Sequence, residues 1–389
     1  MTVRWSDSTT DKFVGFGEGP QASISVADEM GMLRSLIKKG SVGLAESYFD
    51  GFWTTDDLAT LLEVGAANLD ARSDALLSRA WVHRLRDIWD KRPQQLRSDA
   101  IHEMADHYNL GNEFYAMWLD PSMTYSSALY ESPDDSLETA QERKYDRLCQ
   151  LLELTEGDRV LEIGCGWGGF AEHAASRYGV HVTGLTLSTE HARYARARLA
   201  AAGLDDRTEI KLQDFRHEQA MYDKVVSIEM IESVDETNWP PLFHAISRAL
   251  PPGGKAAMQV ITIDERFYES LLKYRDFIKT YIFPGGALPS LSVLKELSSA
   301  AGLSWVSAAS HGHDYAATLN EWARRFEAAW PDIVAQDPVF DEAFHRIWRY
   351  YLEYCEAGFR TGRIDGYQIL FERPQPPSPL QADGLGSTA

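Results

Sequence analysis

A short apolar segment that runs directly into a glycine-rich turn constrains the fold of this sequence most. Residues 160–163 are Val-Leu-Glu-Ile, and a helical pattern begins at Phe170. Four glycines lie between them: Gly164, Gly166, Gly168 and Gly169. Glycine tolerates backbone angles that other residues avoid and lets a ligand approach the main chain. A strand, a glycine turn and a helix in this order are typical of the first unit of a doubly wound parallel sheet.

The acidic residues near the turn indicate which cofactor it binds. A dinucleotide-binding fold needs a carboxylate at the end of its second strand for the ribose, but the strand expected over residues 181–187 ends without one. Instead, Glu162 stands just before the first glycine, and Gln213 and Asp214 close the third expected strand. A carboxylate favours a cation and repels a pyrophosphate. The turn therefore predicts a site for the cationic sulfonium compound S-adenosylmethionine (SAM).

Charge and cysteine content exclude several classes of function. The formal net charge of −20 argues against nucleic-acid binding, which relies on Lys and Arg, and against firm electrostatic anchoring on an anionic membrane. The three cysteines match neither a disulfide framework nor zinc spacing. His311 and His313 lack a neighbouring carboxylate pattern, so no metal site is expected. No apolar run reaches the ~20 residues that cross a bilayer, and we expect a soluble cytoplasmic protein.

The predicted organisation has three consecutive parts. Residues 1–92 carry apolar side chains at helical spacing, which predicts a small helical module after a loosely ordered start. Residues 93–373 alternate strand-like and helical patterns, which predicts a doubly wound, mostly parallel α/β sheet. The proline-rich residues 374–389 lack apolar periodicity and are expected to be disordered. The expected strands cover residues 159–164, 181–187, 209–214, 222–229, 255–263, 303–311 and 366–373.

Two segments interrupt the alternation of strands and helices. Residues 264–297 follow an expected strand and contain many apolar residues, among them Phe267 and Phe277. Residues 315–359 are helical and rich in aromatic residues such as Trp322. Inserts after the carboxyl end of a strand build the substrate pocket in such folds. The apolar first insert favours a lipid substrate, and the aromatic residues of the second are expected in the core, with a lipid-tunnel wall as the alternative.

Several segments together resemble the cyclopropane-fatty-acyl-phospholipid synthase family, which includes the mycolic-acid cyclopropane synthases. Besides the glycine turn, they cover residues 107–115, 119–126, 229–234, 281–290 and 350–360. The resemblance implies a Rossmann-like class I SAM-dependent methyltransferase. It also implies transfer of a one-carbon group from SAM to the cis double bond of an unsaturated acyl chain of a phospholipid, which gives a cyclopropane fatty acid.

The family's catalytic positions fall on five residues of this sequence. In the family, a base removes a proton from the transferred methyl group, and this base is taken to be a bound bicarbonate held by side chains and a backbone group. Matched one position at a time, the family's glutamate falls on Glu232 and its tyrosine on Tyr315. Its cysteine is replaced by Ser127 and its usual histidine by Gln259, whereas Ile261 is kept. A serine amide can still bind an anion, but glutamine cannot titrate.

The same matching assigns the contacts to SAM, from its methionine part to its adenine. His191 stands where the family usually has glutamine. Asp214 is expected to accept a hydrogen bond from the exocyclic amine while Phe215 stacks on the ring. The predicted SAM residues are Tyr125, Ser126, Glu162, Gly164, Gly166, Thr186, Ser188, His191, Gln213, Asp214 and Phe215.

Alternative functions are open at this point. If the proton leaves another carbon after a hydride shift, the product is a methyl-branched or methylene fatty acid, although the ring is favoured. A small-molecule SAM methyltransferase would need polar groups in its pocket, and the apolar insert over residues 264–297 disfavours it. A non-enzymatic SAM-binding protein should lack a carboxylate at the position of Glu232.

A lipid enzyme of this charge needs a local contact with the membrane. The helical residues 27–89, with Phe49, Phe52 and Trp53 around a glycine, are the expected place for a transient contact with the inner membrane face. A lid, a module that only packs on the sheet, or a homodimer contact through the same surface are the alternatives, because an exposed apolar patch can serve a protein partner as well as a membrane.

Overall fold

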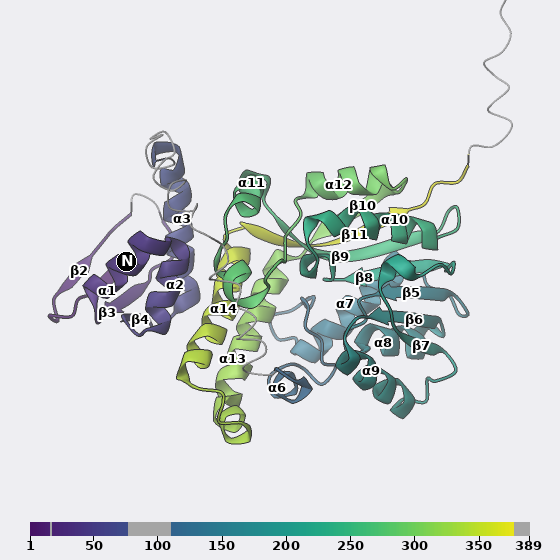
Figure 1. The fold of residues 1–389 in the computed structure, drawn as a ribbon, viewed down its shortest axis with the longest axis horizontal. Helices are drawn as coiled ribbons and strands as arrows, with labels where there is room; N and C mark the ends of the chain where they lie inside the picture. Colours follow the sequence, from purple (N-terminus) through teal and green to yellow (C-terminus); the bar gives the residue numbers. More distant parts are fainter. Residues whose placement is uncertain (16–17, 77–109, 377–389) are drawn as a thin grey trace, which may run out of the picture. The chain divides into compact units, whose positions relative to one another are not determined.

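The computed structural model describes residues 1–15, 18–76 and 110–376 (Figure 1). The chain forms two compact units. Of the described residues, the amino-terminal unit combines those within 1–121, 266–286 and 312–365, and the sheet unit combines those within 122–265, 287–311 and 366–376. Most of both expected inserts therefore belongs to the amino-terminal unit. The predicted boundary between residues 92 and 93 lies outside the described residues and stays a prediction.

A mostly parallel sheet forms the centre of the sheet unit. Its strand order is β10-β11-β9-β8-β5-β6-β7. β5 pairs in parallel with β6 and β8, β6 with β7, and β8 with β9, whereas β10 and β11 are antiparallel. All the strands expected from the sequence are present, which confirms the doubly wound α/β fold. They are β5 (Arg159–Ile163), β6 (His181–Thr186), β7 (Thr208–Leu212), β8 (Lys224–Ile228), β9 (Lys255–Ile263), β10 (Ser304–Ser310) and β11 (Ile364–Glu372).

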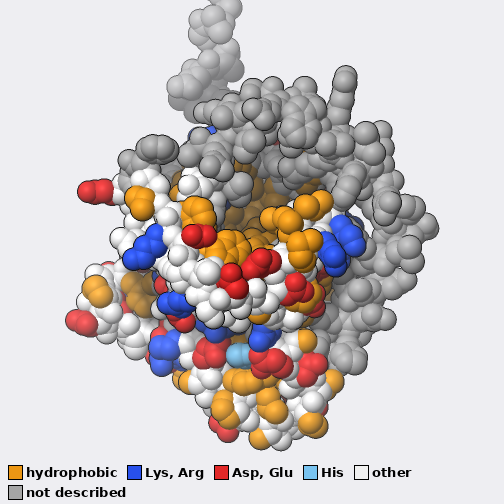
Figure 2. All heavy atoms as spheres, turned by 90° about the vertical axis from the view of Figure 1, so that its left-hand side faces the viewer, with side chains coloured by type: hydrophobic (Ala, Val, Ile, Leu, Met, Phe, Trp, Pro, Cys, Tyr) orange, Lys and Arg blue, Asp and Glu red, His pale blue; other side chains and the backbone are white. Residues whose placement is uncertain are grey.

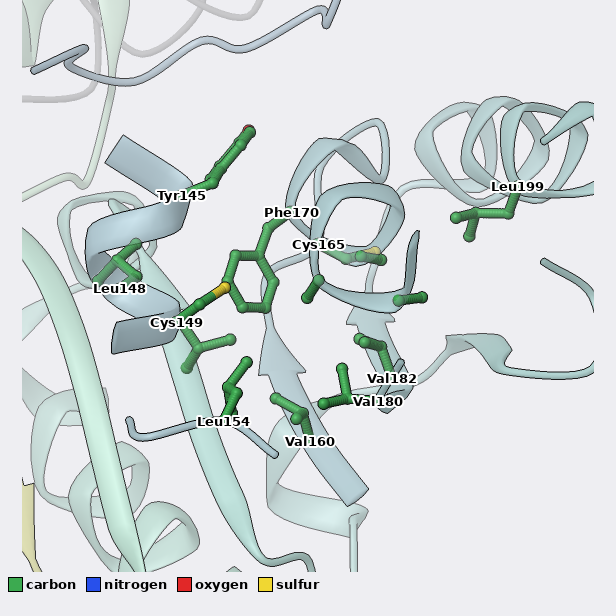
Figure 3. Packing of buried hydrophobic residues seen from close by; sticks show 14 of the residues in the cluster. Tyr145, Leu148, Cys149, Leu154, Val160, Cys165, Phe170, Val180, Val182 and Leu199 are labelled. Carbon is green, nitrogen blue, oxygen red and sulfur yellow. The ribbon is translucent and has the colours of Figure 1, made fainter. Parts of the chain in front are cut away.

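Helices cover both faces of this sheet. Successive strand residues such as Val160 and Leu161 point to opposite faces, and both are buried. On one side, α7, α8 and α9 pack around a buried cluster that includes Val160 and Phe170 (Figure 3). On the other, α10 packs against α12, and Phe243 of α10 lies with its ring centroid 5.8 Å from that of Phe371 in β11. These helices are α7 (Leu137–Leu151), α8 (Gly169–Tyr178), α9 (Thr189–Ala201), α10 (Trp239–Ala249) and α12 (Leu291–Ala300).

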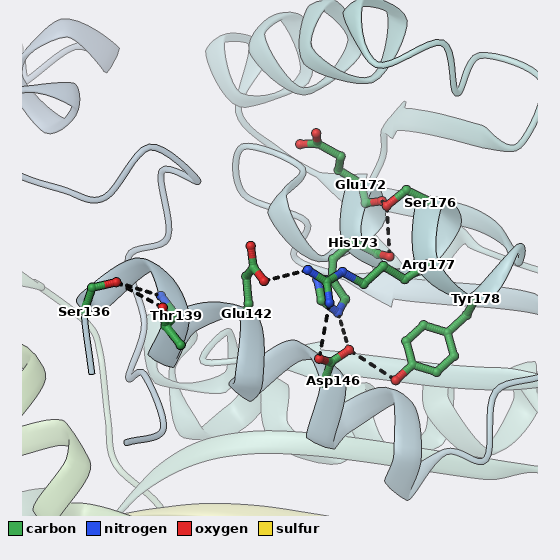
Figure 4. Close-up of polar contacts among 9 residues, drawn as sticks. All are labelled: Ser136, Thr139, Glu142, Asp146, Glu172, His173, Ser176, Arg177 and Tyr178. Carbon is green, nitrogen blue, oxygen red and sulfur yellow. Dashed lines mark hydrogen bonds and ion pairs between the residues drawn. The ribbon is translucent and has the colours of Figure 1, made fainter. Parts of the chain in front are cut away.

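A polar cluster fastens α8 to α7 (Figure 4). The Asp146 carboxylate of α7 accepts hydrogen bonds from His173 at 2.7 Å and Tyr178 at 3.2 Å, both in α8. Arg177 of α8 pairs with Glu142 of α7 at 2.6 Å. Burial lowers the pKa of His173, and the neighbouring Asp146 opposes this shift. Since α8 begins directly after the glycine turn, these contacts hold the turn in a fixed position against α7.

The amino-terminal unit contains a small sheet of order β2-β1-β3-β4 that the sequence did not predict. The helices expected in this module are present as α1, α2 and α3, but the expectation of a loosely ordered start is wrong, because that part of the chain contributes strands to this sheet. Each strand spans only two to four residues, which is too short to display the alternation that identifies strands. Its elements are β1 (Thr2–Arg4), β2 (Thr10–Lys12), β3 (Ser23–Val26), β4 (Trp53–Thr54), α1 (Glu29–Lys39), α2 (Ser41–Phe49) and α3 (Leu58–Leu76).

Aromatic residues form the core around two long helices of the same unit, α13 (Gly312–Gln336) and α14 (Glu342–Arg360). Phe114 of α6 (Asn112–Ala116) lies 5.6 Å from Phe344 and 5.1 Å from Trp348 of α14 between ring centroids, and Trp118 lies 6.0 Å from Trp322 of α13. All five rings are buried, which confirms the interpretation of Trp322, Phe344 and Trp348 as core. The first insert adds α11 (Glu265–Lys273) and a π-helical turn, Ile278–Ile282.

Within the described ranges, no helix is long and apolar enough to cross a membrane. No group of three or more His, Cys, Asp or Glu side chains in these ranges is arranged to hold a metal ion. Residues 374–376 form neither helix nor strand. The remainder of the expected tail, residues 377–389, and residues 107–109 of the first family-like segment lie outside the described residues.

Candidate active site at the carboxyl end of the sheet

The glycine turn follows β5, which has β6 on one side and β8 on the other. The strand order reverses at this point, where open α/β sheets bind their ligands. Gly164 and Gly166 have φ angles of +83° and +48°, which favour glycine. A Cβ atom on Gly164 would lie 2.6 Å from Met230 Cγ, whereas a Cβ atom on Gly166 would meet nothing within 4 Å. Gly164 thus makes room for Met230, and Gly166 presents its backbone to open space.

Glu162, the residue before the turn, carries a buried carboxylate. It is 2% exposed, and its Oε2 atom has no hydrogen-bond partner among the described residues. Burial raises the pKa of Glu162 well above its ordinary value, and the Lys144 ammonium opposes this shift. Lys144, also buried, donates a hydrogen bond to Ser126 Oγ at 2.6 Å. Because a buried charge needs a partner, an unpaired acidic oxygen beside the turn fits a cation such as SAM.

The residues expected near the ribose are joined by hydrogen bonds at the end of β6. Ser188 caps α9, since its Oγ accepts a hydrogen bond from the backbone N–H of His191 at 3.2 Å. The backbone N–H of Ser188 donates to Thr186 Oγ1 at 3.1 Å. The His191 ring lies against Trp167 of the glycine turn, with centroids 4.6 Å apart, and burial lowers its pKa. His191 therefore supports the turn, whatever it contributes to SAM.

The residues expected at the adenine edge follow β7. Asp214 binds Arg216 through both carboxylate oxygens: Oδ1 accepts from Nε at 2.9 Å and Oδ2 from Nη2 at 2.7 Å. These bonds lower the pKa of Asp214. Gln213 donates to Glu218 at 3.1 Å, and the Phe215 side chain is buried. A carboxylate has about four acceptor positions, so the predicted bond from Asp214 to adenine is compatible with the Arg216 pair.

The loop of residues 122–130 carries three more of the predicted residues. Tyr125 is half-buried, whereas Ser126 and Ser127 are buried. The backbone N–H of Ser127 donates to Glu229 Oε1 at 3.0 Å. Gln259 Nε2 donates to the same oxygen at 2.8 Å and to Ser127 O at 3.1 Å. The structure thus joins Ser127 to Gln259 through Glu229, a residue that the sequence analysis did not assign.

Glu232 lies in a short 3₁₀ helix, Ile231–Ser233, just after β8. Its Oε1 accepts a hydrogen bond from the backbone N–H of Ile261 at 2.6 Å, while its buried Oε2 has no partner among the described residues. Desolvation and the nearby Glu229 raise the pKa of Glu232 to about 8, against the opposing effect of the Ile261 N–H. Glu232 and Ile261 are therefore brought together, and Glu232 is an acid that can exchange a proton near neutral pH.

Tyr315 belongs to the amino-terminal unit, near the start of α13. Its buried ring stacks on Phe359 of α14 with centroids 4.3 Å apart and meets Trp322 edge to face. These contacts fix the orientation of the ring. The catalytic role of Tyr315 stays a prediction.

Three residues that contribute to the site were missed from the sequence. Lys144 shares its helical phase with the buried Ala140 and Leu148, so a lysine in the apolar stripe of α7 could have indicated it. Gln368 of β11 donates to Gln259 Oε1 at 2.9 Å. The two residues are 109 positions apart in the sequence, so no local pattern predicts this contact. Glu229 begins a family-like segment but was assigned no role, although its place directly after a buried strand is typical of functional residues.

The comparisons with known proteins agree on one family. The family model described as mycolic acid cyclopropane synthetase matches residues 95–369. Tuberculostearic acid methyltransferase UfaA1 of Mycobacterium tuberculosis is 38% identical over 392 residues, which cover 97% of this chain and 88% of the relative. The cyclopropane-fatty-acyl-phospholipid synthase of Escherichia coli K12 is 35% identical over 346 residues, covering 87% of this chain and 85% of the relative.

Solved structures show the same fold. The cyclopropane synthase MmaA2 from Mycobacterium tuberculosis superposes with a TM-score of 0.64 at 29% identity. The mycolic acid cyclopropane synthase CmaA1, complexed with SAH and CTAB, gives a TM-score of 0.64 at 30% identity. Each covers 73% of this chain and 99% of its own. Together with the family match and the glycine turn at the switch point of the sheet, these similarities show that the chain belongs to the mycolic acid cyclopropane synthetase family and is a SAM-dependent methyltransferase.

Proposed function

We propose that this enzyme transfers a one-carbon unit from SAM to the cis double bond of an unsaturated phospholipid acyl chain and forms a cyclopropane ring. The observation that carries the proposal is the pair of carboxylates, Glu229 and Glu232, beside the glycine turn. Met230, between them in sequence, fills the space next to Gly164. The pair supplies negative charge and a proton acceptor near the turn, which a reaction through a carbocation requires. The names of the two relatives, both acting on fatty acids, support an acyl substrate.

The chemistry that follows from this proposal is balanced in two steps. The alkene π electrons form a bond to the methyl carbon while the bond from that carbon to sulfur breaks, which releases S-adenosylhomocysteine and leaves a cation on the acyl chain. A base then removes one proton from the new methyl group, and the C–H electron pair closes the ring. Glu232, held by the Ile261 N–H, is positioned to hold or receive this proton.

The product test uses fatty-acid methyl esters from a bacterial host that makes unsaturated phospholipids and expresses this chain. A ring product gains one CH₂ unit and loses its olefinic protons. Vinylidene or methyl-doublet NMR signals in the new product would contradict ring formation. The host carrying a Glu232→Gln variant is the control, because it should show neither product.

A second product is favoured by one specific observation. The N–H of Ser127, the expected anion-binding group, is bonded to the Glu229 carboxylate, and Gln259 in the usual histidine position cannot titrate. A base in a different place removes a different proton, which leads to a methylene or methyl-branched chain. The relative that covers 97% of this chain is named a tuberculostearic acid methyltransferase, which supports the same alternative. The NMR signals named above distinguish the two products.

For SAM binding, we expect Gly166→Ala to weaken affinity about tenfold or more, because a methyl group would project where the ligand must approach the backbone. Gly157→Ala is the matched control. Gly157 also has a positive φ, +87°, and its Cβ would likewise meet nothing within 4 Å, but it lies in the loop before β5. Both variants place an alanine at a positive φ, so calorimetry with SAM should separate an effect on the ligand from the effect of backbone strain. Equal affinities would argue against the turn as the SAM site.

The proposed membrane contact has a specific location on α1. Gly43 of α2 lies so close to Ser35 that it leaves no room for a side chain, so α1 packs on α2 through this face. The opposite face of α1 is apolar and exposed, and the exposed Arg34 and Lys38 flank it. Apolar side chains bordered by basic ones suit an interfacial helix on an anionic bilayer. The exposed apolar residues of this stripe are Met30 (56%), Leu33 (47%), Leu36 (40%) and Ile37 (61%).

Figure 2 shows a face of the molecule on which hydrophobic side chains gather with Lys and Arg side chains near them.

We expect the double variant Leu33→Asp and Ile37→Asp to lose most of its binding to vesicles of unsaturated anionic phospholipid, because two charges enter the apolar stripe. Met221→Asp, at a residue that is 50% exposed in the sheet unit, is the control. Vesicle sedimentation measures the binding. A loss of dimers with unchanged vesicle binding would assign the stripe to self-association instead.

A further inference from the structure

Glu229 has a backbone conformation that is unusual for its residue type. Its φ angle is +48°, in the left-handed region that favours glycine. Such strain costs free energy and persists at positions where surrounding contacts enforce it, often at functional sites. Here, the backbone N–H of Glu229 donates to Gln259 O at 2.8 Å, which holds the residue at the end of β8. A glycine would relieve the strain, so the glutamate side chain is kept at a cost in stability.

The Glu229 carboxylate accepts two hydrogen bonds from the sheet unit. Its Oε1 atom binds the Ser127 backbone N–H at 3.0 Å and Gln259 Nε2 at 2.8 Å. The Gln259 amide cannot rotate freely, because its Oε1 atom accepts a hydrogen bond from Gln368 Nε2 at 2.9 Å. Two fixed N–H donors that converge on one oxygen form an anion-binding arrangement. In this enzyme, the anion is a side chain.

We propose that Glu229 is a built-in carboxylate that takes the place of a bound small carboxylate such as bicarbonate beside the reacting carbons. The inference rests on the proposed function and deepens it by naming the group that faces the carbocation. The Ser127 N–H and Gln259 amide orient Glu229, whose negative charge stabilises the cation. The proton lost from the acyl chain passes to the Glu229 carboxylate, which is the ionised member of the pair. The C–H electron pair remains on carbon, and solvent then takes the proton from the enzyme.

The two carboxylates divide the charge between them. Glu229 is stabilised as an anion by the Ser127 and Gln259 donors, whereas the partner that the described residues give Glu232 is the Ile261 N–H. Two nearby carboxylates do not ionise together readily, so the proton stays on the less solvated one. Glu229 thereby raises the pKa of Glu232. The pair can therefore hold one negative charge and one proton, which a separate bound anion would otherwise supply.

Chemical rescue tests this inference. The variants are Glu229→Gly, which also removes the backbone strain, and Glu229→Gln, which keeps the size of the side chain. In buffer freed of carbon dioxide, wild type should keep its turnover of SAM on unsaturated phospholipid vesicles. Both variants should lose at least tenfold, and bicarbonate or formate at millimolar concentration should restore Glu229→Gly but not Glu229→Gln, because only glycine leaves space for the anion. A merely structural role for Glu229 would not give rescue.

Glu153→Gly is the matched control for the glycine variant. Glu153 is also a glutamate with positive φ, +52°, but it pairs with Lys255 at 2.6 Å and follows α7. It should keep wild-type turnover with and without bicarbonate. The inference would be overturned if wild type required bicarbonate, or if Glu229→Gly kept full turnover in its absence.

Binding of the anion separates this inference from the proposed function. By calorimetry, Glu229→Gly should bind bicarbonate or formate, and wild type should not, whether or not any lipid is turned over. Wild type that binds bicarbonate would overturn the inference even if a cyclopropane product forms. Wild type that turns over no lipid would overturn the proposed function, while the binding comparison would still decide the role of Glu229.

Discussion

Replacing Glu232 by glutamine is expected to lower the turnover of SAM on unsaturated phospholipid by about 10²–10⁴-fold, the usual effect of removing a positioned acid or base. Glutamine can still accept the hydrogen bond from the Ile261 N–H, now seen at 2.6 Å, but it carries no charge and cannot take up the proton. Release of S-adenosylhomocysteine in the presence of vesicles measures the effect. Glu236→Gln, at an exposed carboxylate in the following 3₁₀ turn, is the control. Equal turnover in both variants would remove Glu232 from the chemistry.

The same residue predicts a dependence on pH. The pKa of Glu232 is raised to about 8 from an ordinary 4.5, so the folded state prefers the protonated carboxyl. Its contribution to stability is therefore fully present below pH 4.5 and is lost as pH rises through about 8. We expect the melting temperature of wild type to fall relative to that of Glu232→Gln between pH 6 and pH 9. A constant difference over this range would show that Glu232 does not titrate there.

The second large effect is expected at Glu162. Glu162→Gln should weaken SAM binding by about 10–100-fold, because a hydrogen bond to a charged group contributes about 1.5–3 kcal/mol and each 1.4 kcal/mol is tenfold in affinity. The glutamine side chain has the same size, so the glycine turn keeps its shape and only the charge facing the cation is lost. Calorimetric titration with SAM measures the change.

A second ligand sharpens this experiment. S-adenosylhomocysteine has the same adenosine and amino-acid parts but no positive sulfur, so Glu162→Gln should weaken its binding less than that of SAM if the carboxylate acts on the sulfonium. Glu190→Gln, at an exposed carboxylate in the first turn of α9, should change neither affinity. An equal loss for both ligands would assign Glu162 to the amino group or to the turn instead.

The sheet unit was predictable from sequence because its signals are long and local. Strands such as β8 (Lys224–Ile228) are apolar runs buried on both faces, and the glycines after β5 mark the turn by residue type alone. The small amino-terminal sheet was missed because β4 has only two residues and β1 three. Strands this short can be recognised only by the strands they pair with, and the local sequence carries no information about those partners.

The candidate site likewise contains residues that the sequence predicts and residues whose role depends on distant partners. Glu232 was predicted from the resemblance, and the structure brings it to Ile261. Glu229 was overlooked because its importance depends on a positive φ and on donors from Ser127 and Gln259, which are 102 and 30 residues away along the chain. Neither property follows from residue type or spacing. Family matching led to the expected donors but not to the side chain that they bind.

The close approach of Gly164 to Met230 has a consequence for redesign of the enzyme. Any side chain at position 164 would collide with Met230, which lies between the two carboxylates in sequence. The predicted SAM turn and the segment that carries the two carboxylates therefore pack directly against each other. Libraries that aim to change the product should therefore vary residues 229 and 232 while keeping Gly164, and should allow smaller side chains at Met230 whenever the turn itself is altered. We expect changes in the turn and changes at residues 229–232 to affect each other through this contact.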